Sequence, residues 1–125
     1  MAPRVLLAED EPNIVESLTF LLERAGFGVT VVSDGQGALT AALEAPPHVM
    51  ILDVMLPTLD GFEILRRLRA DDRGRAVPVI MLTAKGQRAD REAALGSGAD
   101  LFITKPFSNA GLIEAVRRLA GAAAS

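Results

Sequence analysis

Several short apolar runs in this sequence end in side chains that can do chemistry. In chain order these side chains are Glu9, Asp10, Asp53, Thr83 and Lys105. A carboxylate next to buried apolar residues loses its hydration, which costs free energy unless a cation pairs with it. Carboxylates that meet at close range also repel one another and raise each other's pKa values. Mg²⁺ suits such a cluster best, because it takes one or two carboxylates and leaves positions open for phosphate oxygens.

The elements that must position these side chains alternate along the chain. Five apolar runs are expected to form strands, at residues 4–8, 28–32, 48–53, 77–83 and 101–104. Helices are expected between and after them, at residues 12–26, 35–44, 61–70, 87–95 and 108–121. The first helix has apolar residues at helical spacing, with Pro12 in its first turn and Gly26 at its exit. Ser33 or Asp34 is expected to cap the second helix, and Ser108 the last.

The alternation predicts an α/β fold made of five βα units. Continuous apolar strands that alternate with helices indicate a parallel sheet covered on both faces. Right-handed crossovers then give a (βα)5 three-layer sandwich. Ligands of such sheets bind outside the carboxyl ends of the strands, where the strand order reverses. If the first, third, fourth and fifth strands are neighbours, the candidate side chains all face one crevice.

Composition limits the classes of function. The 125 residues suggest one domain, and no apolar run approaches the roughly 20 residues of a membrane span. The first residues run straight into acidic ones rather than forming a secretory signal, so we expect a cytoplasmic protein without membrane contact. Cysteine is absent, which excludes disulfides and thiolate metal sites. A net charge of −3 and the absence of tyrosine and tryptophan argue against direct nucleic-acid binding.

Over essentially its whole length the sequence resembles a receiver domain of bacterial two-component response regulators. The residues that carry the resemblance, at spacings that suit the family, are Glu9-Asp10, Asp53, Thr83 and Lys105-Pro106. The segments LPTLDGFEIL (56–65) and GADLFITKPF (98–107) resemble the family's loop after the acceptor and its fifth strand. The resemblance implies a flavodoxin-like sheet with strand order 2-1-3-4-5.

The resemblance also implies a mechanism. Asp53 would accept a phosphoryl group from the phosphohistidine of a sensor histidine kinase or a phosphotransfer protein, forming an acyl phosphate. Asp10 and Asp53 would hold Mg²⁺ directly, and Glu9 would reach it through water. The main-chain carbonyl of Met55 would complete the protein ligands. Mg²⁺ and Lys105 would neutralise charge on the transferring oxygens.

A conformational output is implied by the same resemblance. In the phosphorylated state Thr83 would bond to the phosphoryl group, and Phe102 would turn toward the space left behind. The Lys105-Pro106 peptide bond is expected to be cis. The surface of about 87–119, formed by the fourth helix, fifth strand and fifth helix, would be the output face, for an unknown partner or a homodimer. The chain is then a signalling switch that catalyses only its own phosphorylation and dephosphorylation, not an enzyme.

Other functions on this sequence remain open at this stage. An interaction module of the same fold would bind partners without phosphorylation. A phosphatase of the haloacid-dehalogenase type would need a second acid two residues after Asp53, where Met55 stands. A flavin binder would need a phosphate loop after the first strand, where Glu11 and its neighbours repel phosphate. We expect the receiver domain at 1–121, with 122–125 as a short tail or the start of a linker.

Overall fold

The computed structural model describes residues 2–83, 96 and 98–124. Its elements, in chain order, are β1 (Arg4–Ala8), α1 (Pro12–Arg24), β2 (Gly28–Val32), α2 (Gly35–Glu44), β3 (Val49–Asp53), α3 (Gly61–Ala70), β4 (Val79–Thr83), β5 (Leu101–Thr104) and α5 (Asn109–Ala124). The helix expected at 87–95 lies outside the described residues. Among the described residues, no helix has the length and apolar character needed to cross a membrane.

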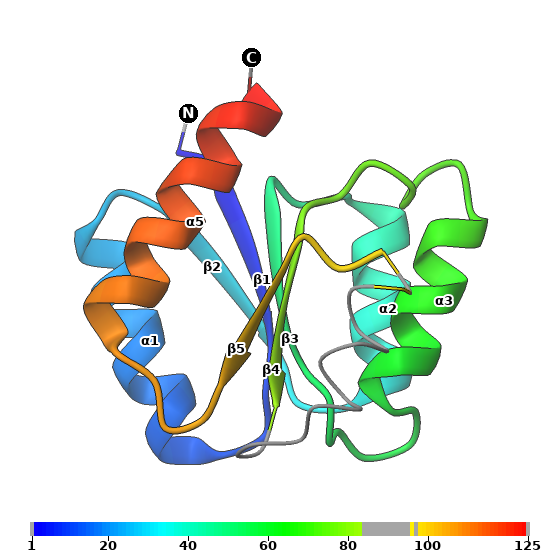
Figure 1. Cartoon of the computed structure of the whole chain (residues 1–125), viewed down its shortest axis with the longest axis horizontal. Helices are drawn as coiled ribbons and strands as arrows, with labels where there is room; N and C mark the ends of the chain where they lie inside the picture. Colours follow the sequence, from blue (N-terminus) through cyan, green and yellow to red (C-terminus); the bar gives the residue numbers. More distant parts are fainter. Residues whose placement is uncertain (1, 84–95, 97, 125) are drawn as a thin grey trace.

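The five strands form one sheet in the order β2-β1-β3-β4-β5. Every neighbouring pair is parallel. Helices α1 and α5 cover one face of the sheet, and α2 and α3 cover the other (Figure 1). This arrangement confirms the predicted α/β class, the three layers and the strand order. The order reverses beside β1, so a crevice is expected at the carboxyl ends of β1 and β3.

Two separate apolar cores follow from the alternation of side chains along each strand. In β1, Val5 and Leu7 pack toward α1 and α5, whereas Leu6 and Ala8 pack toward α2 and α3. All five residues of β3 and all five of β4 are buried. Because these two strands lie inside the sheet with helices on both faces, they read as continuous apolar runs rather than as alternating ones.

Local chemistry sets the ends of the helices and strands, and three ends differ from the predicted bounds by two residues or more. Helix α1 ends at Arg24 rather than 26, because Gly26 adopts a left-handed φ of 99° that a helix cannot continue through. The strand expected at 77–83 begins only at Val79, since Val77 donates its N–H to a turn and Pro78 has none. Helix α5 continues to Ala124, three residues past the expected end.

Helix starts follow the cap chemistry. The Asp34 carboxylate accepts a hydrogen bond from the Gly37 N–H at 2.7 Å, which makes Asp34 rather than Ser33 the cap of α2. Ser108 Oγ accepts from the Gly111 N–H at 3.1 Å and caps α5 as predicted. These two caps fix the first turns of the helices that follow β2 and β5.

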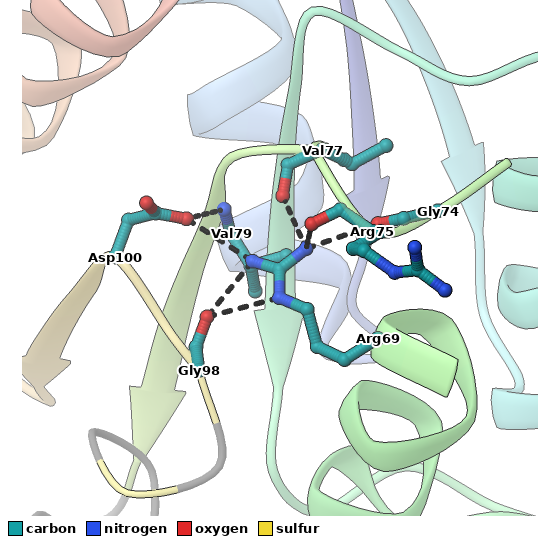
Figure 2. Close-up of polar contacts among 7 residues, drawn as sticks. All are labelled: Arg69, Gly74, Arg75, Val77, Val79, Gly98 and Asp100. Atoms are coloured by element: carbon teal, nitrogen blue, oxygen red, sulfur yellow. Dashed lines mark hydrogen bonds and ion pairs between the residues drawn. The ribbon is translucent and has the colours of Figure 1, made fainter. Parts of the chain in front are cut away.

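At the amino ends of β4 and β5, one guanidinium joins three segments of chain (Figure 2). Arg69, on α3, donates to the carbonyl oxygens of Gly98, Gly74, Arg75 and Val77 at 2.7–3.3 Å. It also forms an ion pair of 3.2 Å with Asp100, whose carboxylate accepts from the Val79 N–H at 2.8 Å. Burial lowers the pKa of Arg69, and the charge of Asp100 opposes that effect.

We expect Arg69→Met to lower the free energy of unfolding by about 2 kcal/mol, because it removes charge-assisted hydrogen bonds and leaves carbonyls unpaired. Urea titrations of both proteins measure the difference. Arg66→Met on the same helix is the matched control, since Arg66 is exposed and pairs only with half-buried Glu63 among the described residues. Loss of that surface pair should cost no more than about 0.5 kcal/mol. Equal losses in the two variants would contradict a special role for Arg69.

Candidate functional site

The candidate side chains gather at the carboxyl edge of the sheet. Glu9 and Asp10 follow β1, Asp53 ends β3, and Thr83 ends β4. Lys105 follows β5, whose Thr104 is aligned with Thr83. Parallel pairing places the ends of β1, β3, β4 and β5 side by side, so residues far apart in the sequence meet there.

Lys105 pairs with the buried carboxylates. Its ammonium Nζ lies 3.0 Å from Asp53 Oδ2 and 3.2 Å from Glu9 Oε1. Asp53 and Glu9 are buried, at 4% and 0% exposure. Burial lowers the pKa of Lys105, but its contacts with Asp53 and Glu9 outweigh burial, so the pKa lies above the ordinary value. Lys105 is therefore a cation that compensates the two buried carboxylates.

One ammonium does not balance the negative charge of the cluster. Burial, together with the hydrogen bond and charge of Asp53, raises the pKa of Glu9 to about 7. The Glu11 N–H donates to Glu9 Oε2 at 3.2 Å and, with Lys105, opposes this rise. Although Glu9 Oε1 lies close to Lys105, it receives no hydrogen bond of ordinary geometry from the described residues. The site therefore keeps an excess of negative charge that a further cation would neutralise.

The oxygen donors fit a hard divalent cation. One carboxylate oxygen each from Glu9, Asp10 and Asp53 lies within 4.8 Å of the other two. Asp10 is exposed while the other two acids are buried, so the cluster opens to solvent on the Asp10 side. An all-oxygen set with an open side is the kind that Mg²⁺ prefers, because this ion keeps several waters.

The loop after β3 forms a wall beside this cluster. The Met55 N–H donates to Asp53 Oδ1 at 3.0 Å, while the Met55 side chain is 72% exposed. Asp10 and the loop residues line a surface hollow of about 340 Å³. The metal-binding role predicted for Met55 involves only its main-chain carbonyl. Its exposed side chain takes no part in that role.

Thr83 lies at the carboxyl end of β4, whereas Phe102 is aligned with Met81, two residues before the end of β5. Thr83 is buried, at 1% exposure, and its carbonyl accepts from the Lys105 N–H at 2.8 Å. The Lys105-Pro106 peptide bond is cis. Phe102 is half-buried and packs against the core shared with α2 and α3. Phe102 thus lies on the strand between the amino-end Arg69 network and Lys105.

Sequence reasoning missed Gly61, which the geometry of the site requires. A Cβ at Gly61 would lie 2.8 Å from Val54 Cα and 2.9 Å from the Asp53 carbonyl oxygen. The Gly61 N–H also donates to the Val54 carbonyl oxygen at 2.8 Å. The signal in the sequence is the Asp60-Gly61 pair at a helix start, where Asp60 caps α3 through the Glu63 N–H.

Comparison with known proteins places this arrangement in a family. The family profile described as response regulator receiver domain matches residues 5–117. The DNA-binding response regulator MtrA of Mycolicibacterium smegmatis is 43% identical over 117 residues, which are 94% of this chain and 50% of the relative. The chain spans about half the length of such curated relatives.

Solved structures give the same answer. The receiver domain of the Francisella response regulator 1452 is similar with a TM-score of 0.89 and 35% identity, covering 96% of this chain and 98% of that one. The receiver domain of sensor histidine kinase PA1611 of Pseudomonas aeruginosa has a TM-score of 0.84 and 35% identity, over 97% and 99%. That structure has a magnesium ion coordinated in its active-site cleft. The chain belongs to the response regulator receiver domain family.

Proposed function

We propose that this chain is a phosphoacceptor switch in which Asp53 carries the phosphoryl group. The observation that supports it most directly is the contact of the Lys105 ammonium with both Asp53 and Glu9, beside the exposed Asp10 carboxylate. A buried carboxylate beside a cation, opening to solvent through a second acid, suits the capture of an anionic phosphoryl group. The donor is a phosphohistidine of a sensor histidine kinase or a phosphotransfer protein.

The transfer is a nucleophilic displacement at phosphorus. A carboxylate oxygen of Asp53 forms a bond to phosphorus as the bond from phosphorus to the histidine nitrogen breaks, and the electron pair stays on that nitrogen. The product is an acyl phosphate on Asp53. Lys105, whose ammonium contacts Asp53, would neutralise negative charge on the transferring oxygens.

The acidic cluster is the proposed binding site for Mg²⁺. Asp10 and Asp53 would hold the ion directly, Glu9 through water, and the Met55 carbonyl would complete the protein ligands. When bound, Mg²⁺ supplies positive charge that stabilises the oxygens of the transferring group. The buried Glu9 oxygen without a hydrogen bond supports this assignment, because a metal-bound water is a natural donor to it.

Output is proposed to follow from Thr83 and Phe102. A phosphoryl group on Asp53 adds charge and acceptor oxygens, to which the Thr83 hydroxyl can donate. The population of the inward orientation of Phe102 would then rise. The size of the rise is set by how differently the phosphoryl group interacts with the two states. The proposed output face is the surface of about 87–119, which comprises β5, α5 and the helix expected at 87–95, outside the described residues.

The biological setting is part of the proposal rather than of the geometry. The chain would act in the cytoplasm as the receiver unit of residues 1–121, with 122–125 as a tail or the start of a linker. The relatives named DNA-binding are about twice as long as this chain. The expectation of no direct nucleic-acid contact therefore concerns this segment alone. An output partner or a homodimer through the output face stays a prediction.

Acetyl phosphate and Mg²⁺ should phosphorylate the chain once. We expect intact mass spectrometry to detect the mass of one added phosphoryl group on the unaltered chain and none on Asp53→Asn, because the amide is not a nucleophile. Asp72→Asn is the matched control, since Asp72 is exposed and lies on the loop after α3. A folded chain that stays unlabelled while it binds Mg²⁺ would defeat the proposal.

Glu9 should make the metal-free chain less stable as pH rises. Its pKa is about 7 in the folded state against 4.5 ordinarily, so the folded chain binds more protons than the unfolded chain between these values. The resulting stability is complete below about 4.5 and is lost as pH rises through about 7. We expect Glu9→Gln to gain on the order of 3 kcal/mol relative to the unaltered chain across this window.

Urea titrations in EDTA at several pH values measure that difference. Glu16→Gln, an exposed acid-to-amide change on α1, is the matched control and should follow the unaltered chain at every pH. Adding Mg²⁺ above pH 7 should restore stability to the unaltered chain by binding its folded state. Stability curves of Glu9→Gln and the unaltered chain that run parallel with pH would contradict the assignment.

A further inference from the structure

A strained turn holds the loop that follows the acceptor. Thr58 has a φ of 69°, the only positive φ at a non-glycine residue among those described. The Leu59 N–H donates to the Pro57 carbonyl oxygen at 2.9 Å, so residues 57–59 form a γ-turn centred on Thr58. The γ-turn with positive φ is the rarer and more strained form, and a β-branched residue fits it poorly. Such strain persists only where neighbouring groups hold it in place.

The first turn of α2 supplies those neighbouring groups. The Gly35 N–H donates to the same Pro57 carbonyl oxygen at 2.8 Å, and the Gln36 N–H donates to Thr58 Oγ1 at 3.1 Å. A Cβ at Gly35 would lie 1.8 Å from the Leu59 carbonyl oxygen, so only glycine lets the helix approach this closely. Two N–H groups of α2 that have no partner within the helix are thus bonded to the loop.

Anchors on both sides leave the predicted metal-ligating main chain little freedom. The Val54 N–H donates to the Leu82 carbonyl oxygen at 2.9 Å, and the Val54 carbonyl accepts from Gly61. The Met55 N–H is itself held by Asp53 Oδ1, and the Pro57 carbonyl is the next anchored group. The Met55 carbonyl and Leu56 lie between these anchors, and Leu56 is buried. The position of the Met55 carbonyl therefore depends on how firmly α2 holds the turn.

We propose that Thr58 is a positioning residue, whose hydroxyl bonds to α2 and thereby fixes the Met55 carbonyl for metal binding. The inference rests on the proposed function, since it assumes that Mg²⁺ binds at the acidic cluster. Holding a ligand in place before binding avoids the entropy cost of ordering it, and partners beyond the ligands themselves influence metal affinity in this way. The strain at Thr58 lowers the stability of the fold, and the fixed position of the Met55 carbonyl is what that loss maintains.

Substitutions at Thr58 separate this role from a merely structural one. We expect Thr58→Gly to weaken Mg²⁺ binding roughly tenfold, because it removes the hydroxyl and frees the turn. Its thermal midpoint should nevertheless equal or exceed that of Thr58→Val, because glycine relieves the positive φ. Thr58→Ser keeps the hydroxyl and should bind Mg²⁺ like the unaltered chain. If Thr58 acted only on the stability of the fold, Mg²⁺ affinity would fall among these variants in the same order as the thermal midpoint.

Amide chemical shifts of ¹⁵N-labelled protein during a MgCl₂ titration give the affinities, since the chain has neither tryptophan nor tyrosine to report them by fluorescence. Thr40→Val, an exposed threonine on α2, is the matched control and should leave affinity unchanged. Unaltered affinity in Thr58→Gly, or a loss in Thr58→Ser equal to that in Thr58→Gly, would overturn the inference while the proposed function stands. Absence of Mg²⁺ binding by the unaltered chain would overturn both.

Discussion

The contact of Lys105 with two buried carboxylates is the constraint on which the site depends. Asp53 and Glu9 are almost completely buried, and an unpaired charge in such a place is very costly. Lys105 approaches both carboxylates at 3.0–3.2 Å only because β5 follows β4 in the sheet and places its end beside theirs. The raised pKa of Glu9 shows that this compensation is incomplete. The remaining excess of negative charge makes the crevice suitable for a divalent cation.

Much of the fold follows from periodicity and local chemistry. Buried strands such as β3 read as continuous apolar runs, and helix-forming segments between them predict a parallel sheet. The errors occur where a single residue overrides the pattern. Pro78 has an apolar side chain but no N–H for the ladder, so the strand begins after it. The alanine-rich end of α5 has no stop signal, and the helix continues to Ala124.

The site could be predicted as a set of residues but not as a set of contacts. Residue types at strand ends identified Asp53, Asp10 and Lys105, and the structure brings them together. The direct approach of Lys105 to Glu9 was not predictable, because it depends on side-chain positions across the sheet. The γ-turn at Thr58 was missed for a different reason: threonine carries no signal for positive φ, and only the packed first turn of α2 holds it there.

The guanidinium of Arg69 has a geometric consequence for the sheet. It fastens the entry to β5 at Asp100, whereas the phosphoacceptor chemistry is expected at the opposite end of the same strands. The four residues of β5 lie between Asp100 and Lys105, which are therefore five residue steps, or roughly 16 Å, apart. Lys105 is held at the other end by its N–H bond to the Thr83 carbonyl and by its ion pairs with Asp53 and Glu9, so β5 is fastened to its surroundings at both ends.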